Sequence, residues 1–402
     1  MTVAKVEIGF EGPARAVAFR LDDPVYGLLD TGTLGIGEAL VDLSDRIVSL
    51  TVRRGRADDT EPSQAGRAQV TLRNRDGVLD PLNTASSLYP GVEPRRTVNI
   101  YADDKQVFSG FVDDINLDYT AGGDAVVQVS ASDGFSRLAL ATFGTGLAVS
   151  AEDSGARVSS VLASDADLWS GTTDIDTGDS TLTAGTATGN VLAYLRQVAQ
   201  SEGGFLFVSR DGKLTFRNRN NPAQNPDGLT LSDAGGTACT PYTSIRRNAG
   251  VEDLYNVISG TVGETELSAS DQDSIDDYGV RDLELGDLFL SASDAQDRLD
   301  YELAKRSRPL TRVFAVEVDQ LSTPSGCTKT LDHELGEAVT VVFTPPGVAQ
   351  QTETAVVIAI EHLFTVGQSW RTVFGMIPRD GSPFLILDDV TYGLLDTGTL
   401  AF

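Results

Sequence analysis

The sequence predicts a mainly β protein with an α/β insert in its middle. Segments that alternate apolar and polar residues run through about 46–132 and again through about 255–377, and turn-rich stretches separate them, as in the strands of a barrel or sandwich. Between these two groups, 189–204 has the apolar spacing of an amphipathic helix. This order predicts two β-rich domains separated by an α/β insert.

The first β-rich domain is predicted at 41–142. Its five alternating segments are 46–55, 66–74, 96–104, 105–119 and 123–132. Stretches such as DGVLDPLN between them supply turn residues. Strands at this spacing predict a small closed barrel or a sandwich, and DGFSRLALAT (133–142) predicts a helical exit from it.

The insert is predicted at 143–242. It contains a short helix at 156–164 and a longer one at 189–204, which Asn190 caps and Gly203 ends. The segment 205–219 follows as a hairpin around Asp211-Gly212, because that dipeptide favours a tight turn.

The second β-rich domain is predicted at 243–380. Its strands are expected at 255–262, 311–320, 337–343, 353–364 and 368–377. A helix at 293–308 interrupts them, with Ser293 and Gln296 spaced as a capping box and Pro309 as its stop.

Charge excludes a protein that grips nucleic acid. The formal net charge is −27, and 252–300 alone contains fourteen acidic residues and two arginines. A phosphate backbone binds through Lys and Arg, so this segment repels it. The N-terminus has no secretory signal and no stretch reaches the ~20 apolar residues that span a bilayer, so we expect a soluble chain made in the cytoplasm.

No catalytic, cofactor or metal site is predicted. The two histidines are interpreted as structural, His333 in a polar loop and His362 in a strand. Adjacent carboxylates are frequent, but neighbours in a strand point to opposite faces, which disfavours a glycosidase pair. The run Asp174–Asp179 lacks the spacing of an EF-hand, so a solvated loop is favoured and calcium stays a weak alternative. Cys239 and Cys327 predict no disulfide framework.

A repeated peptide stands at both ends of the chain. LDDPVYGLLDTGTL (21–34) and LDDVTYGLLDTGTL (387–400) are identical at twelve of fourteen positions. These copies lie in an N-terminal arm, 1–40, and a C-terminal arm, 381–402. Each has a turn at Asp-Thr-Gly and apolar side chains that fourteen residues cannot bury alone, so each copy needs a groove. The partner-docking residues predicted from it are Tyr26, Leu28, Leu29, Asp30, Gly32, Leu34, Tyr392, Leu394, Leu395, Asp396, Gly398 and Leu400.

Several segments in order resemble one family. The first runs from SLTVRRGR through QAGRAQVTLRNRDGVLDPLN and VNIYADDKQVFSGFVDDI to SASDGFSRLA, and the later ones include NVLAYLRQVAQSEGGFLFVSRDGKLTFRNR and VVIAIEHLFTVGQSWRTVFGMIP. Over about 46–378 this succession resembles the minor tail proteins, or tail hubs, of long-tailed bacteriophages, particularly siphophages of actinobacteria.

The resemblance implies a baseplate-hub-like fold with two tube-type β-barrel domains per chain. It implies a non-enzymatic virion protein of the tail tip, a homotrimer whose pseudo-sixfold ring joins the hexameric tail tube to distal tip or fibre proteins and encloses the DNA exit channel. Implied partners are therefore the tube or a distal tail ring protein, other tail-tip proteins and the tape-measure protein, without specific nucleic-acid binding or membrane insertion.

Two hypotheses link the resemblance to residues. The first places part of the acidic segment on the channel wall, the candidates being Asp271, Asp273, Asp276, Asp277, Asp282 and Glu284; a solvated acidic surface is the alternative. The second docks the repeated peptides into equivalent grooves, so that a trimer offers six clips; packing of each arm on its own chain is the alternative. Rival functions are a hexameric distal tail ring protein and a tip-borne cell-wall or glycan hydrolase.

Overall fold

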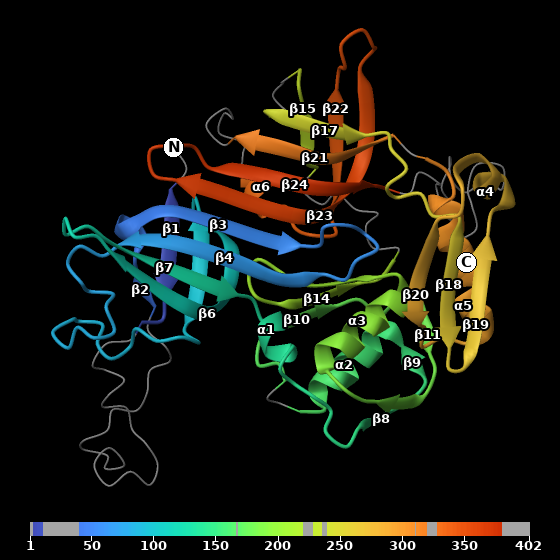
Figure 1. The fold of residues 1–402 in the computed structure, drawn as a ribbon, viewed down its shortest axis with the longest axis horizontal. Helices are drawn as coiled ribbons and strands as arrows, with labels where there is room; N and C mark the ends of the chain where they lie inside the picture. Colours follow the sequence, from blue (N-terminus) through green and yellow to red (C-terminus); the bar gives the residue numbers. More distant parts are fainter. Residues whose placement is uncertain are drawn as a thin grey trace.

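The fold is built on one large sheet whose strands come from both halves of the chain. The computed structural model describes residues 3–10, 40–165, 168–219, 228–234, 239–309, 311–319 and 328–379. In this part of the chain fourteen strands share the large sheet, and smaller sheets and helices pack beside it (Figure 1). The predicted fold class, mainly β with an α/β insert, is confirmed. None of the helices in the described residues is both long and apolar enough to cross a membrane.

The first β unit contains the predicted segments of the N-terminal half. Its strands are β3 (Ile47–Gly55), β4 (Gln64–Arg73), β5 (Thr97–Ala102), β6 (Lys105–Tyr119) and β7 (Ala125–Ser132), extended at β5 by β1 (Ala4–Ile8) and β2 (Val41–Asp42), with a short 3₁₀ helix, η2 (Ser44–Arg46). Alternate residues of these strands are buried, as a period of two requires for a sheet with one covered face. Val52, Val70, Ile100 and Val129 belong to its core.

The second β unit is built from the C-terminal half. Its strands are β17 (Ser244–Asn248), β21 (Arg312–Asp319), β22 (Ala338–Phe343), β23 (Gln351–Thr365) and β24 (Arg371–Pro378), extended at β22 by β15 (Thr230–Ser232) and β16 (Thr240–Pro241); α6 (Thr328–Asp332) precedes β22. The core of this unit contains Val316, Val341, Val357 and Phe374.

The two units have the same strand topology. The first pairs β3-β4-β7-β6-β5, and the second pairs β17-β21-β24-β23-β22, each in the same chain order. The longest strands, β6 and β23, have fifteen residues each, and both carry a bulge where they face their hairpin partner, at Asp113 and at Ile358. Each unit is therefore one copy of a duplicated five-stranded motif.

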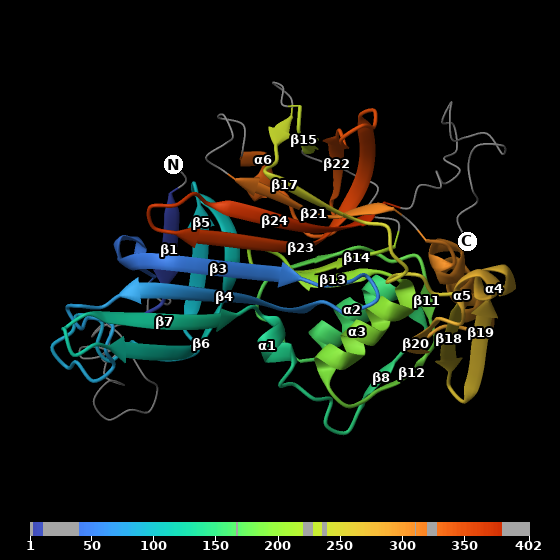
Figure 2. The ribbon, with the colours of Figure 1, turned by 45° about the horizontal axis from the view of Figure 1, so that its top comes forward.

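A strand pair joins the two copies into a single sheet. The second half of β23, from Ala359 to Thr365, pairs antiparallel with β3 (Figures 1 and 2). At this junction Gly55 has φ +101°, and a Cβ placed there would lie 2.1 Å from the carbonyl oxygen of Ile358, the bulged residue of β23. Only glycine allows both the backbone conformation and the close approach of the two strands.

The α/β insert follows the first unit. Its helices are α1 (Phe135–Leu138), α2 (Ser154–Ala163) and α3 (Val191–Glu202), and its strands are β8 (Leu147–Val149), β9 (Glu152–Asp153), β10 (Thr173–Ile175), β11 (Thr181–Leu182), β12 (Gly185–Ala187), β13 (Phe205–Val208) and β14 (Leu214–Arg217). The predicted caps of the long helix are confirmed: the side chain of Asn190 accepts from the Ala193 amide, and Gly203 is left-handed. The hairpin turns at Gly212 with φ +82°, as predicted.

Strand β13 is shared by two cores. Leu206 and Val208 pack with α3 in the core of the insert, whereas Phe205 and Phe207 pack in the core of the second β unit. Because successive side chains of a strand point to opposite faces, one four-residue strand covers both.

A separate small unit stands between β17 and β21. It consists of β18 (Val257–Val262), β19 (Thr265–Ser270), α4 (Gln272–Tyr278), β20 (Asp282–Asp287) and α5 (Ala292–Arg306), and its three strands form their own sheet. The segment 255–262, expected in the second domain, thus joins this small sheet instead of the large one. Leu299 and Ala295 of α5 cover its inner face, in a core shared with the insert.

The predicted cap of α5 is wrong by two residues. Ser291, not Ser293, is the N-cap, and its hydroxyl accepts from the Asp294 amide at 3.1 Å. Ser293 lies within the first turn because the extended backbone ends at Ser291.

The junction predicts a strong effect of one methyl group. We expect Gly55→Ala to lower the free energy of unfolding by about 3 kcal/mol, since the left-handed backbone and the collision with Ile358 both add cost. Gly123→Ala is the matched control: its φ is +82°, but nothing lies within 4 Å of the added Cβ, so about 1 kcal/mol is expected. Urea denaturation measures both, and equal losses would contradict the role of the close approach.

Candidate assembly surfaces

The repeated peptide and the acidic segment are the two surfaces that the sequence singles out. All twelve docking residues of the repeat, from Tyr26 to Leu34 and from Tyr392 to Leu400, lie outside the described residues. Docking of the repeat therefore stays a prediction.

The six acidic candidates all lie on the small unit of β18–β20 and α4. Asp271 is the N-cap of α4 and accepts from the Ser274 amide at 3.0 Å. This hydrogen bond, above all, lowers the pKa of Asp271. Arg308 lies 3.2 Å from Asp277 and 3.8 Å from Asp271, so the fold brings these two carboxylates to one guanidinium. Asp273 and Asp276 are exposed on the same helix.

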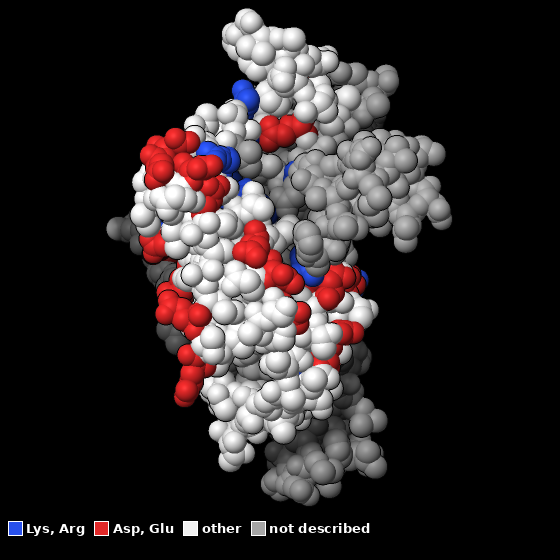
Figure 3. Space-filling model, turned by 90° about the vertical axis from the view of Figure 1, so that its right-hand side faces the viewer, with Lys and Arg blue, Asp and Glu red and all other residues white. Residues whose placement is uncertain are grey.

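Strand β20 presents the remaining two candidates on one face. Asp282 and Glu284 are exposed and alternate with Leu283 and Leu285, which pack in the core. Figure 3 views the molecule from this side and shows acidic side chains spread over the face, with few Lys and Arg between them. The arrangement gives an acidic outer surface.

A buried ionic cluster ties the β3–β4 loop to α5. Glu302 lies at its centre, with Oε1 2.7 Å from Nη1 of Arg298 and Oε2 2.6 Å from Nε of Arg306. Arg306 also reaches Asp59 of the loop at 2.8 Å, and Lys305 lies 3.3 Å from the same carboxylate. Glu302, Arg298 and Arg306 are each less than 10 % exposed. The first β unit is thereby held to the small unit.

Burial and the basic neighbours shift the pKa values of the two acids of the cluster, Glu302 and Asp59, in opposite directions. Burial raises the pKa of Glu302, but Arg298 and Arg306 outweigh it and bring that pKa down to about 2. The pKa of Asp59 is likewise lowered, since Lys305 and Arg306 outweigh its burial. Both carboxylates are therefore charged at neutral pH.

Sequence reasoning missed this cluster, although one signal for it was present. Arg298, Glu302 and Arg306 are spaced four residues apart, a spacing that places opposite charges side by side on a helix. The partner Asp59 lies more than 200 residues away in sequence and could be found only from the fold.

A second buried acid lies where the first β unit meets the insert. Asp133 follows β7 and is 2 % exposed; its carboxylate accepts from the amides of Gly66 and Phe135 at 2.6 and 3.0 Å. Burial raises the pKa of Asp133 to about 7, against the effect of these two hydrogen bonds. Because Gly66 belongs to β4 and Phe135 to α1, these two hydrogen bonds to Asp133 hold α1 against β4.

Both histidines are buried. His362 lies in β23 as predicted; its Nδ1 is 3.1 Å from the Thr372 hydroxyl, and burial, with Arg54 and Arg210, lowers its pKa to about 3. His333 lies in the loop between α6 and β22, as predicted, but this part of the loop is buried: His333 is 1 % exposed and lies 3.3 Å from Glu337, edge-on to the ring of Phe374. It is buried because α6, which precedes it, packs against the sheet.

Two carboxylates of the acidic run at 174–179 form ion pairs with one arginine. Asp174 and Asp176 both lie within 3.2 Å of Arg217 on the neighbouring strand β14. Within the described ranges no group of three or more His, Cys, Asp or Glu side chains is placed to hold a metal ion.

Removal of the central acid of the cluster should destabilise the protein. We expect Glu302→Gln to lower the free energy of unfolding by about 3 kcal/mol, because Arg298 and Arg306 would stay buried without their shared counter-charge. Asp297→Asn, on an exposed position of the same helix, should change it by less than about 0.5 kcal/mol. Calorimetry or urea denaturation compares the two variants. A Glu302→Gln variant as stable as the parent chain would contradict a structural role for the cluster.

The same acid predicts a direction of pH dependence. The pKa of Glu302 is depressed in the folded chain, so the stability it contributes is complete above its ordinary value of 4.5 and is lost as the pH falls through about 2. Unfolding curves of the parent chain and of Glu302→Gln should therefore converge as the pH is lowered across this range. A difference that stays constant from pH 6 to pH 2 would overturn the assignment.

Solved structures similar to this chain include two tail proteins. A tail protein from Neisseria meningitidis MC58 is 11% identical, with 94% of this chain and 97% of that chain covered, at a TM-score of 0.61. The 43 kDa tail protein of prophage MuSo2 from Shewanella oneidensis is 12% identical, with 85% of this chain and 94% of that chain covered, at a TM-score of 0.57. No protein-family model and no curated protein matches the sequence. At these identities the likeness concerns the fold, and the chain has the fold of these two tail proteins.

Proposed function

We propose that this chain is a structural protein of a bacteriophage tail. The duplicated β unit, joined into one sheet by β3 and β23, supports the proposal most directly. Likeness along nearly the full length of a solved tail protein agrees with it. Both tail proteins come from bacteria that are not actinobacteria, so the proposal is not restricted to actinobacterial hosts.

The proposed place is the tail tip, as a trimeric hub between the hexameric tail tube and the distal tip or fibre proteins. Two equivalent β units per chain give six units in a trimer, which is the number that a sixfold tube requires. In this place the chain acts by its shape and contacts, and we assign it no catalytic step. It would reach the virion after synthesis in the host cytoplasm.

The acidic face is proposed to line the channel through which DNA leaves. Asp282 and Glu284 on β20, with Asp273 and Asp276 on α4, are exposed. A wall of carboxylates repels phosphates, so DNA slides past without binding. The two copies of the repeat are proposed to act as clips, six per trimer, for a neighbouring ring protein.

The stoichiometry tests this function. Native mass spectrometry of the purified full-length chain should give three times the mass of one chain, and electron-microscopy projections down the axis should show a ring of six similar lobes. A hexamer would favour a distal tail ring protein instead. A monomer at micromolar concentration would contradict the hub.

A further inference from the structure

Within the two duplicated five-stranded motifs, two strand edges have no partner strand in the part of the chain that the structure describes. Strand β17 pairs only with β21, so its other edge is open. Strand β6 pairs with β5 through Lys105–Phe111, and the backbones of Arg95 and Arg96 then hydrogen-bond to Val112. Past Val112, no strand in the described ranges pairs with this edge of 113–119. Open edges of this kind are templates for pairing with another chain.

The duplication relates these two edges to the junction already formed inside the chain. Strand β17 occupies in the second unit the place that β3 has in the first, and β6 is the counterpart of β23. Aligned on their bulges, Asp113 and Ile358, residues 114–120 correspond to Ala359–Thr365 of β23, the segment that pairs with β3. The pairings of β5 with β6 and of β22 with β23 agree with the same alignment.

We propose that β17 of one chain pairs antiparallel with 114–120 of a second copy, repeating the β3–β23 junction between chains. The inference rests on the proposed hub and names the contact that closes it. Within the chain, Leu50 pairs with Phe364 and Thr51 with Leu363. The counterparts place Ile245 opposite Tyr119 and Arg246 opposite Asp118 of the neighbouring copy.

The side chains of the two edges are complementary. Strand β17 carries exposed Arg246 and Arg247, whereas the open part of β6 carries exposed Asp114 and Asp118. Opposite charges that face one another across two strands stabilise the pairing. The intrachain junction has the same kind of pair, Arg53 opposite Glu361.

An apolar contact stands next to this charge pair. Tyr119 is 60 % exposed, and its hydroxyl donates to Asp80 at 2.6 Å, which fixes the ring at the edge of the unit. In the intrachain junction the counterpart Phe364 packs against the core of the first unit. Pairing with a second copy would cover the ring of Tyr119 with Ile245.

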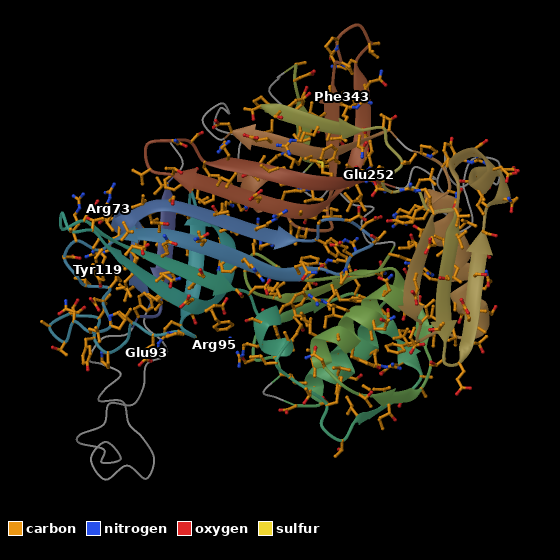
Figure 4. The ribbon with its side chains drawn as sticks, viewed as in Figure 1. Arg73, Glu93, Arg95, Tyr119, Glu252 and Phe343 are labelled. Carbon is orange, nitrogen blue, oxygen red and sulfur yellow. The ribbon has the colours of Figure 1, made fainter. Side chains whose placement is uncertain are left out.

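The two edges lie on different parts of the molecule, so one chain cannot join them to each other. Figure 4 shows Tyr119 at the left and Phe343 at the top, near β17. Arg247 of β17 lies 4.8 Å from the centre of the Phe343 ring. A contact between unlike surfaces is head-to-tail, and with a threefold rotation it closes a ring of three chains.

A disulfide trap tests the register. The Arg56 amide donates to the Ile358 carbonyl, so Gly55 and Ala359, and by alternation Thr51 and Leu363, are pairs without mutual hydrogen bonds, where side chains are closest. In a full-length background with Cys239→Ser and Cys327→Ser, Arg246→Cys combined with Asp118→Cys should therefore form covalent oligomers of up to three chains under mild oxidation. The matched control, Arg246→Cys with Asp114→Cys, moves one thiol by about 13 Å along the strand and should stay uncrosslinked.

A charge swap tests the pairing without cysteine. Arg246→Asp and Asp118→Arg each place like charges opposite one another, and each should weaken the trimer at least tenfold by analytical ultracentrifugation. The double variant restores the opposite pair and should recover assembly, which a mere folding defect would not do.

The outcomes separate this inference from the proposed function. A native trimer without the 246–118 cross-link, or a trimer indifferent to both single swaps, would overturn the strand contact but leave the hub standing. That result would mean that a segment of the same chain or another tail protein covers these edges. A chain that is monomeric before any substitution would overturn both.

Discussion

The pairing of β3 with β23 is the constraint on which the rest of the architecture depends. It fuses two copies of one five-stranded motif into a continuous sheet and fixes their relative orientation through backbone hydrogen bonds. Gly55 and the bulge at Ile358 make the close approach possible. Because backbone ladders tolerate wide changes in side chains, a fold held together in this way can be shared at 11 and 12% identity.

Much of the fold could be predicted from local patterns. Period-two alternation located β3 to β7 and β21 to β24, and the cap residues Asn190 and Gly203 set the ends of α3. The small sheet of β18–β20 could not be assigned, because its strands alternate in the same way as those of the large sheet. Which sheet a strand joins depends on contacts distant in sequence, such as the packing of Leu299 of α5 on β18.

The candidate sites were predictable to a smaller extent. The acidic residues of α4 and β20 could be named from composition, and the structure gathers them on one unit. The buried cluster around Glu302 could not, since burial of a charge is a property of the fold. His333 shows the same limit: its polar neighbours in sequence indicate the loop in which it lies, but not its burial against Phe374.

The two-sided packing of β13 has a mechanical consequence. Phe205 and Phe207 are embedded in one core while Leu206 and Val208 are embedded in the other, so any rotation of the α/β insert against the second β unit would open both at once. Four large apolar side chains would then meet water, at a cost of about 1.5–3 kcal/mol each. The insert and the second unit therefore move as one rigid block, and a force applied to either is transmitted across this strand.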